Sequence, residues 1–164
     1  MQLFISSQSI DTGNQVVFQK ISGSMQGFTL GVSGSKSFEP SSPLFFLASS
    51  GSSVLSCSMP LEKNKWHHIC AQYNRSPGKS RLELWSNSRL QATSARSSFG
   101  EWGFKTSPLH IGSGSNHVTS SLTAANSGFV PRQTFSGSID EFRVFHSYRS
   151  HTAQRTFRHK SIFP

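Results

Sequence analysis

The sequence predicts an all-β fold in which two antiparallel sheets stack as a sandwich, and three observations support this prediction. Four stretches alternate, or nearly alternate, apolar with polar residues: 66–73, 81–85, 108–112 and 135–145. Such alternation is typical of strands with one face on a core and the other in water. Each stretch also ends at a turn signal, at the short spacing of antiparallel hairpins. Finally, 14 Phe residues supply stiff apolar faces and serine occurs in nearly every expected turn, whereas helix formers are scarce.

Further strands are expected earlier in the chain, over residues 2–7, 15–21, 28–32, 44–48 and 54–59. Four apolar side chains from the later strands are expected to share one core: Ile69, Leu84, Ile111 and Val144. Near the C-terminus, Ser150 can cap a short helix that continues to about Phe157. The predicted architecture is therefore a jelly-roll sandwich with one short C-terminal helix.

The length of the chain is that of one domain. A chain of 164 residues buries roughly 70% of the surface that its unfolded form exposes, and no internal repeat or linker-like break interrupts it. We therefore expect one domain over residues 1–164. No apolar run approaches the roughly 18 to 20 residues of a membrane helix, and residues 1–10 lack the pattern of a signal peptide. No membrane insertion is predicted, and the chain can still be part of a longer protein.

The chain is basic, with a net charge of +9 from 16 Lys and Arg against 7 Asp and Glu. Such an excess favours anionic partners such as sulfated glycans, phosphate backbones or acidic proteins. Solubility of a surface poor in carboxylates is the alternative interpretation, and both stay open. Nucleic acid ranks last among the partners, because the aromatic residues follow strand patterns instead of lying between basic residues.

Cys57 and Cys70 are the only cysteines, which is too few for a metal cluster or a disulfide scaffold. They flank the expected turn at residues 60–65, so a disulfide across this turn is possible if the two strands are adjacent. A bridge needs Cα atoms within about 7 Å, which a sequence cannot show. A disulfide and two free thiols are both open alternatives.

Four segments resemble the laminin G-like and pentraxin-like branch of the concanavalin A-like jelly rolls: KWHHICA at 65–71, LELW at 82–85, PLHIG at 108–112 and FSGSIDEFRV at 135–144. Their order and spacing match that family over about residues 2–157. The resemblance implies a recognition module for glycans, sulfated polysaccharides, steroids or proteins, often with calcium at one rim.

Two departures from the family pattern matter. Asn87-Ser88 stands where the family often has Asp-Gly, the dipeptide best suited to a primed turn. The family's usual first strand, which precedes residues 2–7, has no counterpart in this sequence. We expect either that the fold begins late or that a neighbouring chain or segment supplies that strand.

No metal, cofactor or catalytic activity is expected. Calcium takes six to eight oxygen ligands, whereas only Asp140 and Glu141 are adjacent among the acids, so a calcium site is the minority interpretation. The paired carboxylates of a glycoside hydrolase and the Gly-x-Ser-x-Gly of a serine hydrolase are both missing. His67 and His68 would point to opposite faces of a strand and cannot share one metal ion.

The expected function is non-catalytic, lectin-like recognition of a carbohydrate, including an anionic glycan, or of a protein surface at the rim loops. Asn116, His117 and Arg132 are the first candidates for binding, because the loop at 113–133 has no pattern and such long loops are mobile or functional. Trp85 and Arg89 are the second choice. Trp85 can stack on a sugar ring or cover a cross-strand neighbour.

The alternative function is a structural one, in which the domain docks inside a larger complex or particle through an incomplete sheet edge and the basic tail that begins at Arg155. Asn74-Arg75-Ser76 is a glycosylation sequon in an expected surface turn, so a glycan on Asn74 is expected if the protein is secreted. An extracellular or cell-surface location, as part of a larger protein, follows from the resemblance.

Overall fold

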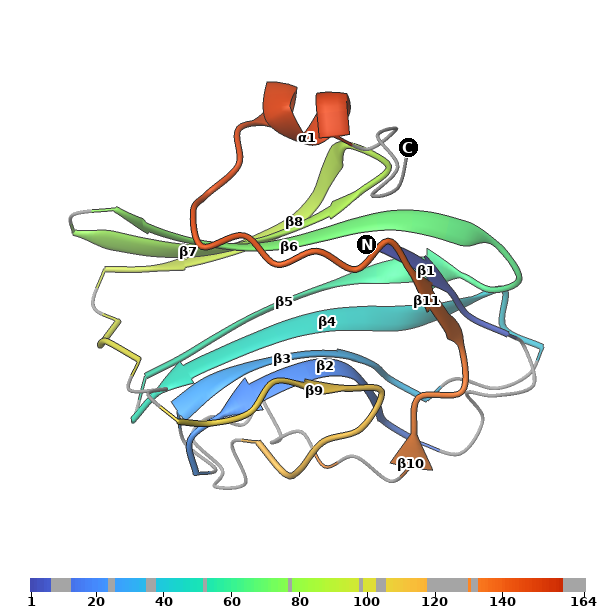
Figure 1. Cartoon of the computed structure of the whole chain (residues 1–164), viewed down its shortest axis with the longest axis horizontal. Helices are drawn as coiled ribbons and strands as arrows, with labels where there is room; N and C mark the ends of the chain where they lie inside the picture. The colour runs from blue at the N-terminus through green and yellow to red at the C-terminus, as the bar shows by residue number, and fades with distance from the viewer. Residues whose placement is uncertain are drawn as a thin grey trace.

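Two stacked sheets and one helix make up the described part of the chain in the computed structural model (Figure 1). The structure describes residues 1–6, 13–23, 26–34, 38–51, 53–76, 78–97, 99–102, 106–117, 130 and 133–157. The first sheet has the order β11 (Ser138–Asp140), β1 (Gln2–Phe4), β6 (Trp66–Ser76), β7 (Lys79–Ser86), β8 (Arg89–Arg96).

The second sheet has the order β10 (Gln133–Thr134), β2 (Gln15–Ile21), β3 (Gln26–Val32), β4 (Ser41–Ser50), β5 (Ser53–Glu62), and β9 (His110–Ile111) also pairs with β2. The strands pair antiparallel apart from the short β10–β2 pair, which is parallel. The predicted all-β sandwich is therefore confirmed.

The core lies between the two sheets and follows from strand alternation. On β5, every second side chain is buried, and these side chains are Leu55, Cys57, Met59 and Leu61. They belong to one apolar cluster with side chains of the first sheet, Ile69 and Leu84 among them. The period of two in the sequence thus sets which face of each strand is buried.

Two of the four expected core residues are not in the core. Ile111 is 50% exposed and Val144 is 68% exposed. The alternation at 135–145 predicted one long strand, but β11 ends at Asp140, whose Oδ1 accepts a hydrogen bond from the Glu141 amide at 2.8 Å. Glu141 has a φ of 52°, a left-handed conformation that turns the chain out of the sheet. Residues 141–149, the crossing segment, then run across the side of the sandwich from β11 toward the helix (Figure 1).

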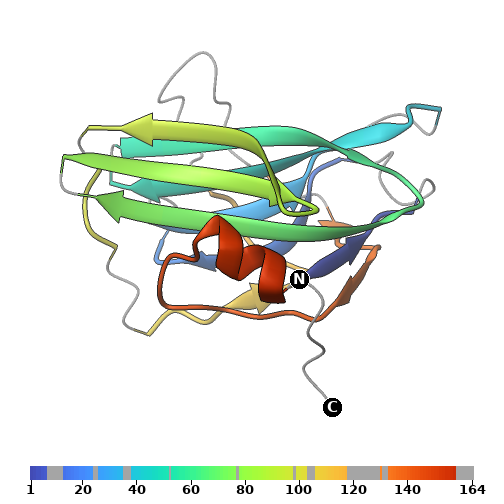
Figure 2. The ribbon, with the colours of Figure 1, turned by 90° about the horizontal axis from the view of Figure 1, so that it is seen from above.

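The helix α1 (His151–Phe157) lies outside the first sheet, as Figure 2 shows from above. The Oγ of Ser150 accepts a hydrogen bond from the Ala153 amide at 3.3 Å, so the predicted N-cap is confirmed. His151 stacks on Trp85, with 5.4 Å between ring centroids, and its Nε2 lies 2.9 Å from the carbonyl oxygen of Ser88. These contacts attach the helix to the β7–β8 hairpin.

The two cysteines are free thiols in different sheets. The segment at 60–65 joins the sheets instead of forming a hairpin, so β5 and β6 are not adjacent strands. Cys57 packs in the core, whereas Cys70 follows the core residue Ile69 and so faces the opposite side of β6. The disulfide alternative is thus wrong, because the condition on which it depended is not met.

The turn between β7 and β8 shows how the chain replaces Asp-Gly. Asn87 has a φ of 50° and Ser88 a φ of 64°, which is the geometry of a type I′ turn. The Oδ1 of Asn87 accepts a hydrogen bond from the His68 amide at 3.2 Å. The predicted hairpin therefore forms, although its second turn residue is not glycine.

Candidate functional site

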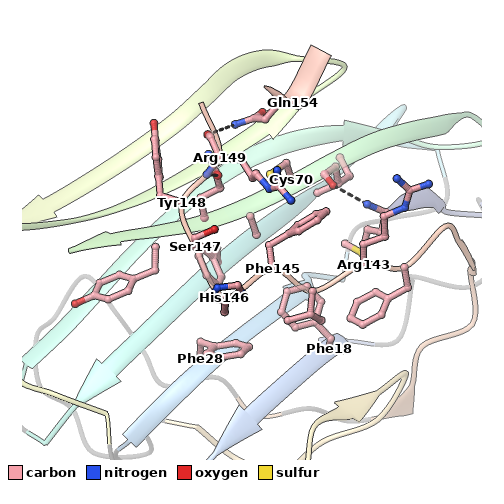
Figure 3. A pocket seen from close by; sticks show the side chains of 18 of the residues that line it. Phe18, Phe28, Cys70, Arg143, Phe145, His146, Ser147, Tyr148, Arg149 and Gln154 are labelled. Atoms are coloured by element: carbon pink, nitrogen blue, oxygen red, sulfur yellow. Dashed lines mark hydrogen bonds between the residues drawn. The ribbon is translucent and has the colours of Figure 1, made fainter. Parts of the chain in front are cut away.

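A pocket of about 340 Å³ opens on the side of the sandwich, between the first sheet and the crossing segment (Figure 3). One wall consists of residues 69–73 of β6, and the opposite wall consists of residues 142–149. We call this cavity the β6 pocket. It exists because β1 is only three residues long and leaves most of β6 without a neighbour on this side.

The floor of the pocket consists of aromatic rings from the core. Phe28 lies edge-on to Phe18, with 5.8 Å between their centroids, and packs against Trp102 at 5.7 Å. Tyr73 lies against the same Trp102 at 4.3 Å. The Nε1 of Trp102 donates a hydrogen bond to the carbonyl oxygen of Ser49 at 2.9 Å. The floor is therefore apolar and held in place by ring packing.

The rim of the pocket is also apolar, although it faces water. Leu109, Val144, Phe145 and Tyr148 all line the pocket and are all exposed. The guanidinium carbon of Arg149 lies 4.1 Å from the centre of the Phe145 ring, a cation–π contact. In Figure 3, Phe145 lies between Cys70 and the floor residues Phe18 and Phe28. An exposed apolar patch that continues into a pocket is typical of a binding surface.

Two buried amide side chains line the pocket with unused hydrogen-bonding capacity. Gln72 is 7% exposed and Gln154 is 5% exposed. The Oε1 of Gln72 accepts a hydrogen bond from the Arg149 amide at 2.9 Å, and the Nε2 of Gln154 donates to the Arg149 carbonyl oxygen at 3.4 Å. Within the described residues, Gln72 Nε2 and Gln154 Oε1 have no partner. Both atoms are buried inside the pocket wall, where an unpaired polar atom is costly.

The ionisable groups of the pocket suit binding more than chemistry. Burial raises the pKa of the Cys70 thiol to about 11, so the thiol is neutral at pH 7 and is not an activated nucleophile. The acid that lines the pocket, Glu141, is 2.6 Å from Arg143. Arg149 adds a second cation, so the described groups around the pocket carry a net positive charge.

The sequence predicts His117 as a binding residue on the rim. The structure corrects its position, because His117 has no exposed surface. Its Nδ1 lies 2.8 Å from Oγ1 of Thr29 and its Nε2 lies 2.7 Å from Oγ of Ser49. Burial lowers the pKa of His117 to about 4, so the ring is neutral. Its neighbour Asn116 is exposed, and Arg132 lies outside the described residues.

Trp85 is covered by a residue of α1 and not by a cross-strand neighbour, the alternative that the sequence offered. His151 of α1 stacks on one face of its ring, and its Nε1 donates a hydrogen bond to Oε2 of Glu83 at 3.0 Å. A sugar would have to displace the helix to reach that face. Arg89 is exposed at the start of β8. The structure therefore does not bring Trp85 and Arg89 together with Asn116, which follows β9 on the second sheet.

The sequon asparagine lies in a strand instead of a turn. Asn74 is half-buried and pairs with Arg81 across the β6–β7 hairpin, and its Oδ1 accepts a hydrogen bond from Ser76 Oγ at 3.4 Å. β6 continues to Ser76, which is further than the sequence indicated. A glycan on Asn74 stays a prediction.

The β6 pocket itself was missed in the sequence, although one signal pointed to it. The alternation at 135–145 predicted that Val144 and Phe145 belong to a strand, and Tyr148 follows three residues later. Three large apolar side chains so close to a helix start are also compatible with an exposed binding segment.

The minority interpretation, a calcium site at Asp140 and Glu141, finds no support among the described residues. Asp140 Oδ1 is occupied by the Glu141 amide, and the carboxylate of Glu141 pairs with Arg143. In the part of the chain that the structure describes, no three His, Cys, Asp or Glu side chains gather as metal ligands. Likewise, no described helix has the length and apolar character needed to cross a bilayer.

A laminin G family model, described as the concanavalin A-like lectin/glucanases superfamily, matches residues 1–153. No curated protein and no solved structure was found to match the chain.

Proposed function

The chain belongs to the concanavalin A-like lectin/glucanases superfamily, and from this membership we propose that it is a non-catalytic recognition module that binds a polypeptide at the β6 pocket. Membership supports a carbohydrate- or protein-binding module in general. The choice of a polypeptide comes from the pocket.

The observation that carries this choice is an exposed apolar rim that continues into an aromatic floor. A polypeptide offers apolar side chains for both the floor and the rim. A sugar ring can stack its C–H face on an aromatic ring, but its hydroxyl groups would lose water against the apolar rim of Leu109, Val144 and Tyr148. The pocket therefore favours a polypeptide over a glycan.

Selection from a displayed peptide library tests the proposal. We expect peptides to be enriched on the wild type, and their affinity to fall at least tenfold on Val144→Asp and Phe145→Ala, because both residues line the exposed rim. The matched control is Phe38→Ala, since Phe38 is 78% exposed and is not part of the pocket. A selection without enrichment, or peptides that bind the rim variants as well as the wild type, would contradict the proposal.

Binding of an anionic glycan is a second candidate, favoured by the charges of β7 and β8. Four basic side chains on these strands are exposed: Lys79, Arg81, Arg89 and Arg96. The acid of the same strands, Glu83, is 3% exposed, so the surface of this hairpin is cationic and suits sulfate groups.

Retention on immobilised heparin at graded salt tests this second candidate. Replacing Lys79 and Arg96 by serine should lower the eluting salt concentration more than replacing Lys20 and Lys65, which removes the same charge elsewhere. Equal effects of the two double variants would indicate general charge attraction and remove this candidate.

The expected assembly role and location are proposals as well. Docking in a larger complex would use the same exposed rim, so size-exclusion chromatography of the wild type and Val144→Asp distinguishes self-association through the rim from a monomer. A glycan found on Asn74 after expression through a secretory pathway would support an extracellular location.

A further inference from the structure

The β6 pocket lies along the edge of a strand. Five consecutive residues of β6, 69–73, line it. Successive side chains of a strand point to opposite faces of the sheet, so a cavity over one face would meet only every second residue. A cavity lined by all five must follow the edge between the two faces. Edges of this kind present unpaired backbone groups and are templates for another strand.

The backbone of β6 has its hydrogen-bonding groups directed into this edge. The Ile69 amide donates to the Met1 carbonyl oxygen at 2.9 Å, and the Ile69 carbonyl oxygen accepts from the Met1 nitrogen at 3.2 Å. Backbone groups that point the same way recur at every second residue, so those of Ala71 and Tyr73 face the same edge. Within the described residues, no other segment makes a backbone hydrogen bond to Ala71 or Tyr73 there.

Building on the proposed function, we infer that this edge is a strand-addition site. An extended segment of a partner protein pairs antiparallel with residues 70–73 of β6, in line with β1, and alternates acidic with apolar side chains. β1 already shows the geometry, because Gln2 faces His68 and Leu3 faces His67 in an antiparallel register. The added strand continues that ladder past Ile69.

The surroundings of the edge set the side-chain pattern of the partner. Residues opposite Ala71 and Tyr73 share their inner face, where Phe28 and Trp102 form an aromatic floor, so these residues are apolar. Residues opposite Cys70 and Gln72 share the outer face, where Gln72 contacts the Arg149 backbone. Arg143 and Arg149 line the pocket with one acid, Glu141, and the buried Glu83, across from Gln72 on the outer face, is 3.6 Å from Arg81. These three cations outnumber the two acids, so acidic side chains complement the outer positions.

A tethered strand tests the pairing without knowledge of the natural partner. The extension Val-Glu-Val-Glu placed directly before Met1 puts valine opposite Ala71 and Tyr73, and glutamate opposite Cys70 and Gln72. We expect it to slow amide hydrogen exchange of Ala71 and Tyr73 at least tenfold, because both amides become hydrogen-bonded. The shifted extension Glu-Val-Glu-Val has the same composition and reverses the faces, so it should protect them less.

A proline in the extension separates pairing from mere coverage. Replacing the valine opposite Ala71 by proline removes the N–H that would donate to the Ala71 carbonyl oxygen, so the strand should not pair there and the protection of the Ala71 amide should be lost. Equal exchange rates of Ala71 and Tyr73 with and without the Val-Glu-Val-Glu extension would overturn the inference.

Peptides from the library selection separate this inference from the proposed function. N-methylation of peptide residues should abolish binding at alternate positions and leave the positions between them unaffected. Peptides that bind at the rim but tolerate every N-methyl group would overturn strand addition while the proposed function stands. If the tethered strand pairs but no library peptide binds, the proposed function and strand addition by a partner protein are both overturned. The edge would then pair with a segment of the protein's own chain.

Discussion

The Nε2 atom of His117 lies 2.7 Å from the Oγ atom of Ser49 on the outer face of the second sheet, where no water reaches the ring. Thr29 Oγ1 holds the other ring nitrogen at 2.8 Å and also accepts a hydrogen bond from Gln19 Nε2 at 2.8 Å. Gln19 in turn bonds both backbone groups of Ser115, at 2.7 Å and 2.9 Å. This network fixes residues 115–117 over β2, β3 and β4, so its charge state matters for stability.

His117 should make the protein less stable in mild acid. Burial lowers the pKa of His117 to about 4 in the folded state, whereas a histidine in an unfolded chain has a pKa of about 6.5. Between these values the unfolded state binds more protons, so the free energy of unfolding decreases as the pH falls from about 6.5 to 4. The full loss, reached below pH 4, is about 3 kcal/mol. Urea unfolding at pH 7 and pH 4.5 should show about 2.5 kcal/mol of it.

The variant His117→Gln provides the comparison, because glutamine does not titrate. It should be less stable than the wild type at pH 7, since it loses ring packing, yet the difference should shrink at pH 4.5. Stability curves of the two proteins that run parallel over this range would contradict the assignment of the pH dependence to His117.

The sequence could predict the parts of the fold that depend on local pattern. β6 and β7 have long alternation, and Ser150 is a recognisable cap, so all three were predicted. His117 could not be placed, because its burial depends on Thr29 and Ser49, which lie on strands far away in the sequence. Val144 was misplaced because alternation continues past Asp140, where a single left-handed residue takes the chain out of the sheet.

The candidate site was harder to predict than the fold, because it is the part of the β6 edge that β1 does not pair with. β1 pairs with Trp66, His67 and His68 and does not reach Ala71. No local sequence pattern indicates where this pairing stops. Trp85 was a reasonable sugar-stacking candidate until the helix was placed over it. Such tertiary contacts decide which aromatic residue is covered and which is free.

Ser88→Gly should stabilise the protein. Ser88 has a φ of 64°, which costs a non-glycine residue about 1–2 kcal/mol, and its buried Oγ has no hydrogen-bond partner among the described residues. Glycine removes both costs but adds about 0.5–1 kcal/mol of chain entropy. We expect a net gain of about 1 kcal/mol, seen as a higher urea midpoint.

Asn87→Gly is the matched variant in the same turn. It also relieves a positive φ, but it removes the hydrogen bond that Asn87 Oδ1 accepts from the His68 amide. Its gain should therefore be smaller than that of Ser88→Gly. A lower midpoint for Ser88→Gly than for the wild type would show that the turn is not strained at this position.

Both cysteines should be free and slow to react in the folded protein. Burial raises the pKa of Cys57 to about 12 and that of Cys70 to about 11, and the thiolate is the reactive form. Alkylation with iodoacetamide at pH 7.5, followed by mass spectrometry, should add little label to the native protein and two labels after unfolding in denaturant without reductant. A Cys57–Cys70 cross-linked peptide in a non-reduced digest would contradict the separation of the two strands into different sheets.

Trp85→Ala should release α1 from the sheet and leave the second sheet intact. The indole ring stacks on His151 at 5.4 Å and donates its hydrogen bond to Glu83, so alanine removes an aromatic contact under the helix. We expect trypsin to cleave near Arg155 several times faster than in the wild type, because local opening exposes the backbone. Trp66→Ala is the control, since Trp66 is 50% exposed and packs on Phe4 instead of the helix. If both variants were cleaved at the wild-type rate, the stack would not hold the helix, and Trp85 would again be a candidate for binding a sugar.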